Sequence, residues 1–94
     1  MPPTDYRLSL TDNALKQVYA LPSKVRGQIE RTIDRLLEHY RAGTRPQDTR
    51  PIRGLPNTFR IDSGEYRVVY EHDAGGEELI VFRIAHRSSV YRGF

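Results

Sequence analysis

The sequence predicts an α+β fold in the order strand, helix, helix, strand, strand, strand, with a helical hairpin packed on one face of a small, mainly antiparallel sheet. Two observations carry this prediction. Apolar residues recur every three or four positions between residues 25 and 40, whereas apolar and polar residues alternate from residue 58 onward. A length of 94 residues suits one domain with a modest core, so we expect residues 1–94 to form a single domain.

The first half of the chain is expected to supply one strand and two helices. Tyr6–Leu10 alternates apolar and polar side chains, as a half-buried strand does. Thr11–Asn13 is typical of a helix N-cap, and a short helix over 14–20 follows it. The apolar residues of this helix share one side: Leu15, Val18 and Tyr19. The Leu-Pro-Ser segment 21–23 ends this helix and starts another, because proline is allowed in a first turn and serine is a suitable cap.

The second helix has the clearest pattern in the sequence. Six apolar residues recur at spacings of three and four and therefore form one stripe: Val25, Ile29, Ile33, Leu36, Leu37 and Tyr40. The opposite face alternates acidic and basic residues, so we expect it to face solvent or a docking partner, since a helix that reads DNA would be more strongly basic. The short connection between the two helices predicts an antiparallel hairpin.

The second half is expected to begin with a long loop and to continue with strands. Residues 42–57 are rich in turn residues, and Gly54 and Pro56 interrupt any strand ladder. Three hairpin-linked strands follow: 58–62, 66–71 and 79–85. The last of these is apolar on both faces, as a central strand would be.

The basic residues are almost all arginine, with Lys16 and Lys24 as the exceptions, and the formal net charge is +3. Arginine binds phosphate oxygens through two parallel hydrogen bonds and stacks on bases, although a GC-rich genome would enrich it as well. The segments 41–60 and 82–94 hold several arginines and a single acidic residue, Asp48. We therefore expect a positive surface on the C-terminal half and an anionic partner.

Several classes of site are disfavoured by composition. The chain has no cysteine, which fits a reducing compartment and rules out thiolate ligands. Its three histidines lack metal-ligand spacing, so we expect neither a metal ion nor a cofactor. No apolar run approaches the ~20 residues that span a membrane, and the N-terminus lacks the features of a signal peptide. We expect a cytoplasmic protein without membrane contact.

An arginine-lined sheet face would suit the cleavage of RNA by its own 2′-hydroxyl group. On the face away from the helices we expect Arg60 and Arg67, joined by Arg83 or by Arg87. The reaction needs cations for the charge that develops on the phosphorane, together with a base and an acid. Arginine supplies only the cation, because it stays protonated. No metal ion is required, since the nucleophile is internal to the RNA.

The acid and the base must come from other residues. The candidates are His86, Tyr91 and Asp62, and His86 is the best poised because the reference pKa of histidine is ~6.5. Tyr91 would donate a proton or stack on a base. Each candidate also has a structural interpretation: His86 fits a hydrogen-bonded strand end, Tyr91 fits a packing residue, and the arginines fit ion pairs worth ~0–1 kcal/mol when exposed. The residues alone leave these alternatives open.

Three segments of the chain resemble the RelE branch of the RelE/ParE toxin superfamily. They are Arg53–Ile61 (RGLPNTFRI), Gly64–Tyr70 (GEYRVVY) and Ile84–Arg92 (IAHRSSVYR). The YR-V-Y strand and the HR–VYR ending are fairly specific at this spacing. The order of elements is also that of the family, so the resemblance covers nearly the whole chain.

The resemblance implies the toxin of a prokaryotic toxin–antitoxin pair. RelE-like toxins enter the ribosomal A site and cut mRNA there by 2′-hydroxyl attack, and a RelB-like antitoxin that wraps the toxin restrains them. For this chain we expect a cognate RelB-like antitoxin, the ribosome and mRNA as partners, with a toxin–antitoxin hetero-oligomer. ParE-like toxins share the fold but poison DNA gyrase by binding. That alternative stays open, as does an inactive module that only binds its antitoxin.

The resemblance also assigns roles to the arginines. By position, Arg67 falls on the arginine of the YR strand and Arg87 on the arginine after the final strand. We assign phosphate stabilisation to both, with Arg60 in support at a position where RelE has a lysine. Three further arginines are expected to bind RNA or phosphate: Arg53, Arg83 and Arg92.

Proton transfer is assigned to His86 and Tyr91. Tyr91 falls on the terminal tyrosine of the family. His86 stands where RelE has another lysine, and some relatives use histidine as the acid–base group. The second strand lysine of RelE falls at or near Asp62, so the basic pair of RelE is not reproduced here.

Overall fold

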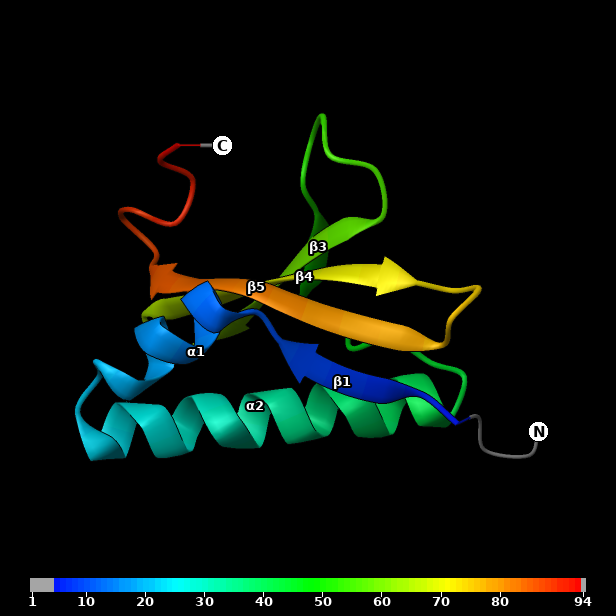
Figure 1. Cartoon of the computed structure of the whole chain (residues 1–94), viewed down its shortest axis with the longest axis horizontal. Helices are drawn as coiled ribbons and strands as arrows, with labels where there is room; N and C mark the ends of the chain where they lie inside the picture. Colours follow the sequence, from blue (N-terminus) through cyan, green and yellow to red (C-terminus); the bar gives the residue numbers. More distant parts are fainter. Residues whose placement is uncertain (1–4, 94) are drawn as a thin grey trace.

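The computed structural model describes residues 5–93, and the elements lie in one sheet with two helices against it (Figure 1). Their bounds are β1 Arg7–Leu10, α1 Asp12–Tyr19, α2 Ser23–Arg41, β2 Thr49–Pro51, β3 Thr58–Ser63, β4 Tyr66–Asp73 and β5 Glu78–His86. The strand order is β1-β5-β4-β3-β2. β1 is parallel to β5, and the other neighbouring pairs are antiparallel. The predicted α+β class is confirmed. Residues 1–4, on which part of the signal-peptide argument rests, and residue 94 lie outside the described residues.

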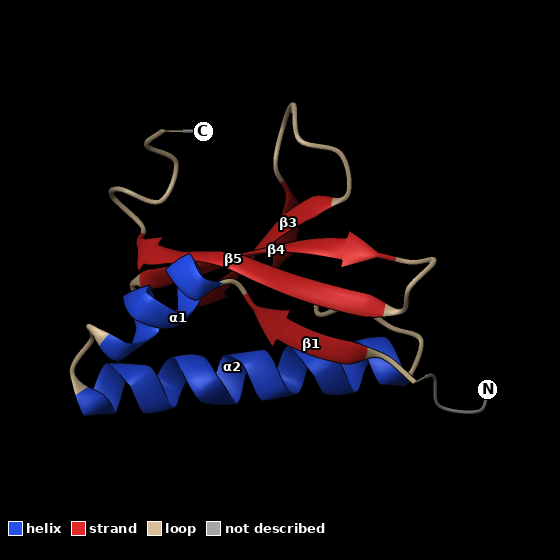
Figure 2. Cartoon of the chain, viewed as in Figure 1, coloured by secondary structure: helices blue, strands red, loops and turns tan. Residues whose placement is uncertain are grey.

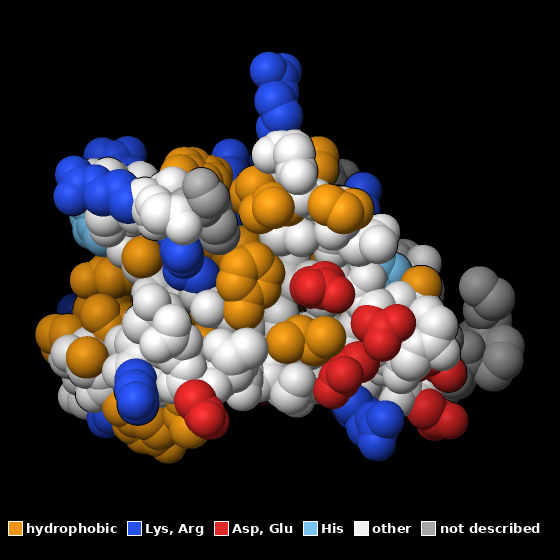
Figure 3. Space-filling model, turned by 45° about the horizontal axis from the view of Figure 1, so that its top comes forward, with side chains coloured by type: hydrophobic (Ala, Val, Ile, Leu, Met, Phe, Trp, Pro, Cys, Tyr) orange, Lys and Arg blue, Asp and Glu red, His pale blue; other side chains and the backbone are white. Residues whose placement is uncertain are grey.

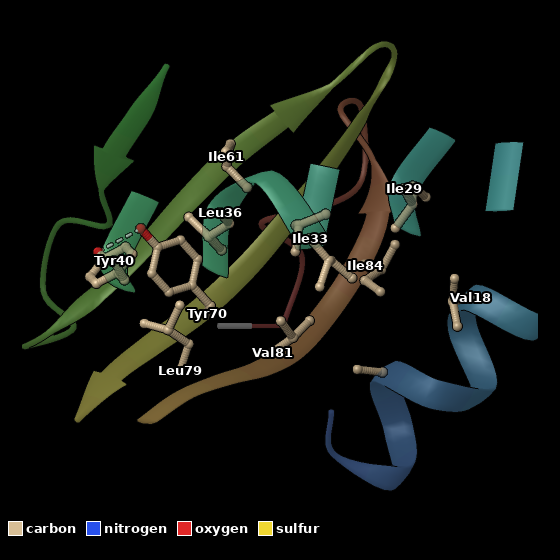
Figure 4. Close-up of a cluster of buried hydrophobic side chains, with 12 residues drawn as sticks. Val18, Ile29, Ile33, Leu36, Tyr40, Ile61, Tyr70, Leu79, Val81 and Ile84 are labelled. Atoms are coloured by element: carbon tan, nitrogen blue, oxygen red, sulfur yellow. Dashed lines mark hydrogen bonds between the residues drawn. The ribbon is translucent and has the colours of Figure 1, made fainter. Parts of the chain in front are cut away.

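α2 runs along the sheet (Figure 2) and supplies a third of the buried core cluster. Four members of the predicted stripe are buried, Ile29, Ile33, Leu36 and Tyr40, whereas Val25 and Leu37 pack at its border. Figure 4 shows the four buried α2 side chains facing side chains of the central strands, namely Ile61, Tyr70, Leu79, Val81 and Ile84. Val68 belongs to the same cluster. The predicted helical period is therefore confirmed. Burial of this apolar area, at about 25 cal/mol per Å², is the main stabilising term of such a core.

α1 begins two residues earlier than predicted. Thr11 is its N-cap, and the Thr11 hydroxyl accepts a hydrogen bond from the Ala14 N–H at 3.2 Å. Leu15, Val18 and Tyr19 do share one side and line a groove of about 250 Å³ beside α2. Of these three residues only Val18 is buried, and Leu15 and Tyr19 are exposed. Ala14 is the second α1 residue in the core.

The long loop contains a strand that the sequence did not predict. Thr49–Pro51 pairs antiparallel with β3, with Thr49 opposite Ile61 and Pro51 opposite Phe59. The prediction that 42–57 is irregular was wrong for these three residues. β2 is an edge strand and pairs with β3 only, so the missing N–H of Pro51 does not interrupt hydrogen bonds to a second neighbour. Residues 52–57 are irregular as predicted, and Gly54 has φ 85°.

A β-bulge in β5 decides which of its side chains face the helices. Val69 pairs with Arg83 but Tyr70 pairs with Val81, so Phe82 is one extra residue. Val81 and Ile84 both reach the core as a result. Arg83 then lies on the opposite face, away from the helices, because successive side chains of a strand alternate.

Among residues 5–93, neither helix is long and apolar enough to cross a membrane.

Candidate functional site

Three predicted arginines lie on the sheet face away from the helices. Arg60 is opposite Val69 and Val69 is opposite Arg83, while Arg67 is opposite Asp62 and Ala85. Their neighbours Ile61, Val68 and Ile84 point into the core, so the arginines point the other way. The expectation that Arg60 and Arg67 share this face with Arg83 agrees with the register.

Asp62 joins two of these arginines. Its Oδ1 atom accepts from Arg60 Nη1 and lies 3.0 Å from Arg67 Nε. Arg67 Nη1 also donates to the carbonyls of Gly64 and Tyr66, each at 3.0 Å. The Arg67 guanidinium is therefore fixed in position by its own hairpin before any ligand arrives, which is the preorganisation that electrostatic catalysis requires.

Arg83 fastens the C-terminal turn to β5. Its Nη1 donates to the carbonyl of Val90 at 3.0 Å and to that of Arg92 at 2.6 Å. Val90 is fully buried although the hydrophobic cluster under the helices does not include it. Arg83 thus has a structural contact besides the phosphate-binding role expected of it.

His86 is the last residue of β5 and lies on the helix side of the sheet. It pairs with Tyr66, and the two rings meet edge to face at 5.5 Å between centroids. The N–H of Ser88 donates to His86 Nδ1 at 3.2 Å, so a neutral His86 ring carries its hydrogen on Nε2. Nε2 lies 3.9 Å from the nearest oxygen of Glu65. The side chains of His86 and Arg67 therefore lie on opposite faces of the sheet.

Arg87 is tied to Glu65 through both backbone and side chain. The Arg87 N–H donates to the Glu65 carbonyl at 2.8 Å, and Arg87 Nε lies 2.9 Å from Glu65 Oε2. Both side chains are well exposed. Glu65 thus contacts two predicted site residues, His86 and Arg87.

Tyr91 and Arg53 line one groove. The groove has a volume of about 540 Å³ and is formed by the turn that carries Tyr91 and by the segment Pro51–Leu55. In Figure 1 this segment and the C-terminal turn both rise from the side of the sheet away from the helices. Tyr91 is half exposed. A ring and a guanidinium beside an open groove are suited to stacking on an unpaired base and pairing with a phosphate.

Arg92 lines a second groove of about 540 Å³ on the other side of the C-terminal turn. Its walls combine polar and apolar side chains from the start of α1, from β5 and from the turn: Thr11, Asn13, Gln17, Phe82, Arg83, Ala85, Ser89 and Arg92. The Gln17 side chain there accepts from the Ile84 N–H at 2.7 Å, beyond the point where β1 ends.

Charge is unevenly distributed over this surface. Figure 3 shows several Lys and Arg side chains on the side where the C-terminal turn rises, whereas most Asp and Glu side chains in this view lie toward the opposite end, next to further basic side chains. The predicted positive surface on the C-terminal half agrees with the basic side chains near that turn.

No three His, Asp or Glu residues come together as candidate metal ligands in the described part of the chain.

A family model for the ParE toxin of the type II toxin–antitoxin system parDE matches residues 8–91. The chain belongs to this toxin family. Within it, the chain is RelE-like: the mRNA interferase toxin RelE of Escherichia coli K12 is 33% identical over 92 residues, covering 92% of this chain and 90% of that protein. Toxin RelE3 of Methanocaldococcus jannaschii is 29% identical over 80 residues, covering 85% and 89%.

The fold is also that of RelE. RelE from the intact E. coli RelBE toxin–antitoxin complex superimposes with a TM-score of 0.70 at 28% identity, covering 86% of this chain and 95% of that chain. The RelE-like resemblance drawn from the three sequence segments is confirmed. This RelE-like chain is the toxin of a toxin–antitoxin pair.

The interpretation of Arg60 and Arg67 as members of ion pairs agrees with the structure, in which Asp62 contacts both. The β3–β4 turn explains why Asp62 is the partner. The residues Gly64 and Glu65 form a two-residue connection in which Ser63 pairs with Tyr66, and that register sets Asp62 opposite Arg67.

Proposed function

We propose that this RelE-like toxin is an endoribonuclease that cuts mRNA on the ribosome by 2′-hydroxyl attack, without a metal ion. The observation that carries the proposal is the fixed guanidinium of Arg67, held by three protein oxygens on an open sheet face beside Arg60. The relative RelE of E. coli is named an mRNA interferase, which supports the same activity.

The cationic role falls to arginines at two places. Arg67 and Arg60 stabilise the negative charge on the phosphorane, because each stays protonated and sits on a rigid strand. Arg87 directly follows β5 and supplies a further cation once its guanidinium separates from the Glu65 carboxylate. Arg53 and Arg92 hold the RNA chain along the two grooves that flank the C-terminal turn.

Proton transfer is the role of Tyr91 and His86. Tyr91 lines a groove on the arginine side and is therefore the better supported proton donor. His86 lies on the helix side of the sheet end, so its part in the reaction requires the RNA to wrap around the end of β5. This difference ranks Tyr91 ahead of His86, which reverses the ranking from reference pKa values.

A RelB-like antitoxin is the partner that restrains the toxin in a hetero-oligomer. RelE is found with RelB in solved complexes of similar chains, including the intact E. coli RelBE complex. The proposal includes residues 1–94 acting as a single domain in the cytoplasm, where ribosomes and mRNA are available.

The test is cleavage of mRNA on programmed ribosomes, with the ends of the fragments mapped. Wild type should cut within the A-site codon and leave a cyclic phosphate. Arg67→Ala should lose about 100-fold or more in rate, the usual effect of removing a transition-state donor. Arg35→Ala is the matched control, since Arg35 also pairs with an aspartate, Asp48, but on α2. Intact mRNA with the wild-type toxin would reject the proposal.

A second function deserves the same assay series because the matching family model describes ParE toxins. ParE-like action would inhibit DNA gyrase by binding. In a supercoiling reaction, inhibition by wild type together with uncut mRNA would favour this second function.

A further inference from the structure

The arginine face already holds an anion of its own. Arg60 Nη1 and Arg67 Nε both contact the same oxygen, Asp62 Oδ1. One oxygen between two guanidinium groups is the arrangement that a non-bridging phosphate oxygen adopts in an arginine site. The Asp62 carboxylate therefore occupies the place where the two arginines would bind a phosphate.

The Asp62 carboxylate can turn away from this arrangement, whereas Arg67 is held in place. The Asp62 side chain is 41% exposed, so a change of rotamer turns it into solvent. Arg67 is 17% exposed, and its Nη1 stays bonded to two carbonyls of its own hairpin. Asp62 is the exposed member of both ion pairs, so water and salt screen the attraction from its side. A phosphodiester that arrives with the right geometry can displace the carboxylate without disturbing Arg67.

Asp62 also lowers the attraction of the face for nucleic acid. Affinity for single-stranded RNA depends on how many cations neutralise phosphates, and a carboxylate between two arginines cancels one positive charge. Repulsion between the Asp62 carboxylate and an RNA phosphate weakens the binding of free RNA more than the binding of RNA that other contacts hold in place.

We propose that Asp62 competes with the RNA phosphate for Arg60 and Arg67, so that the toxin binds free single-stranded RNA weakly and admits a phosphodiester that is already positioned. The identity of the ligand as RNA rests on the function proposed above. The competition itself rests on the shared oxygen and on the difference in exposure between Asp62 and Arg67.

The test compares Asp62→Asn with a matched control, Asp48→Asn. Asp48 is likewise an aspartate in an arginine ion pair and is 40% exposed, but it lies against α2. Both variants remove one negative charge, so any general gain in affinity is the same for both. The probe is a 12-nucleotide single-stranded RNA without ribosomes, measured by fluorescence anisotropy from 50 to 200 mM salt.

Asp62→Asn should bind this RNA about three- to tenfold more tightly than wild type, the range expected when one or two partly exposed ion pairs are removed. The slope of log affinity against log salt should steepen by about 0.7 for each arginine released. Asp48→Asn should gain much less in both measurements, because Asp48 pairs with Arg35 and not with Arg60 or Arg67. Adding Arg67→Ala to Asp62→Asn should abolish the gain. Thermal melting of each variant confirms that the fold is retained.

Equal or weaker RNA binding by Asp62→Asn would overturn the proposal, and weaker binding would show instead that Asp62 orients Arg67. An equal gain in Asp48→Asn would overturn it as well. The ribosome assay separates this result from the proposed function. Cut mRNA with no gain in Asp62→Asn removes the competition alone, whereas a gain with uncut mRNA keeps the anion site and removes the nuclease.

Discussion

Arg83 donates a hydrogen bond from Nη1 to the carbonyl of Val90 at 3.0 Å, so a residue inside β5 holds the turn that carries Tyr91. Replacing it tests whether the turn depends on this contact. Arg83→Met keeps much of the apolar stem and removes the donors, at a cost of about 1–3 kcal/mol for a charged hydrogen bond. Amide exchange should accelerate at residues 88–92 while the amides of β4 stay protected. Unchanged exchange at 88–92 would mean that buried Val90 holds the turn without Arg83.

The hydroxyls of Tyr40 and Tyr70 are hydrogen-bonded at 2.9 Å inside the core (Figure 4). Burial and the contact with Tyr40 raise the pKa of Tyr70 far above its ordinary value. Tyr40→Phe should lower the free energy of unfolding by about 1–3 kcal/mol, because a buried hydroxyl loses its partner. Urea unfolding measures the change. Tyr19→Phe, on an exposed ring, is the control and should change stability by less than about 0.5 kcal/mol.

His72 should make stability depend on pH. Burial, with Arg45 as a second cause, lowers the pKa of His72 below its ordinary value of 6.5. The unfolded chain therefore binds a proton more readily than the folded chain, and stability falls as pH drops below about 6.5 toward the folded pKa. Above that window His72 is neutral in both states and has no effect. Urea unfolding at pH 8, 7, 6 and 5.5 should show a decline in wild type that is smaller in His72→Gln. Parallel declines in both proteins would assign the effect to other groups.

Two glycines should respond to alanine in opposite directions. Gly64, in the β3–β4 turn, has φ 59°, and an added Cβ would lie 2.3 Å from the Gln28 side chain. Gly64→Ala should destabilise the toxin by about 1–2 kcal/mol, the cost of a left-handed conformation for a residue with a Cβ. Gly27 lies within α2, and its added Cβ would meet Arg31 at an ordinary 3.5 Å. Gly27→Ala should stabilise it by about 0.5–1 kcal/mol. Thermal melting of the two variants is sufficient, and a loss of stability in Gly27→Ala would contradict the prediction.

The helices and most strands could be predicted because each has one dominant period. The stripe of α2 and the alternation of β3 need no long-range information. The sequence left open whether Arg83 or Arg87 joins the arginine face, because the face of each β5 side chain depends on the bulge at Phe82. Strict alternation from Val81 would have sent Arg83 toward the helices and His86 away from them. The bulge exchanges the two, and nothing in the local sequence marks it.

The site was predicted in part for the same reason. Arg60 and Arg67 precede the bulge in the sheet register, so their shared face followed from alternation alone. The contacts of Asp62 and Glu65 depend on side-chain rotamers, which a sequence pattern does not contain. β2 was missed because its pairing depends on β3 more than on its own residues, of which Pro51 disfavours a strand.

The parallel pairing of β1 with β5 also has a consequence for when the toxin folds. Arg7 is opposite Glu78, so strands from the two ends of the chain are neighbours, and β5 lies between β1 and β4. Contacts between such distant segments form late, after the loop between them has closed. During synthesis the sheet lacks this central strand until residues 78–86 have left the ribosome. We therefore expect the nascent toxin to be incompletely folded, and its arginine face unassembled, until β5 has emerged.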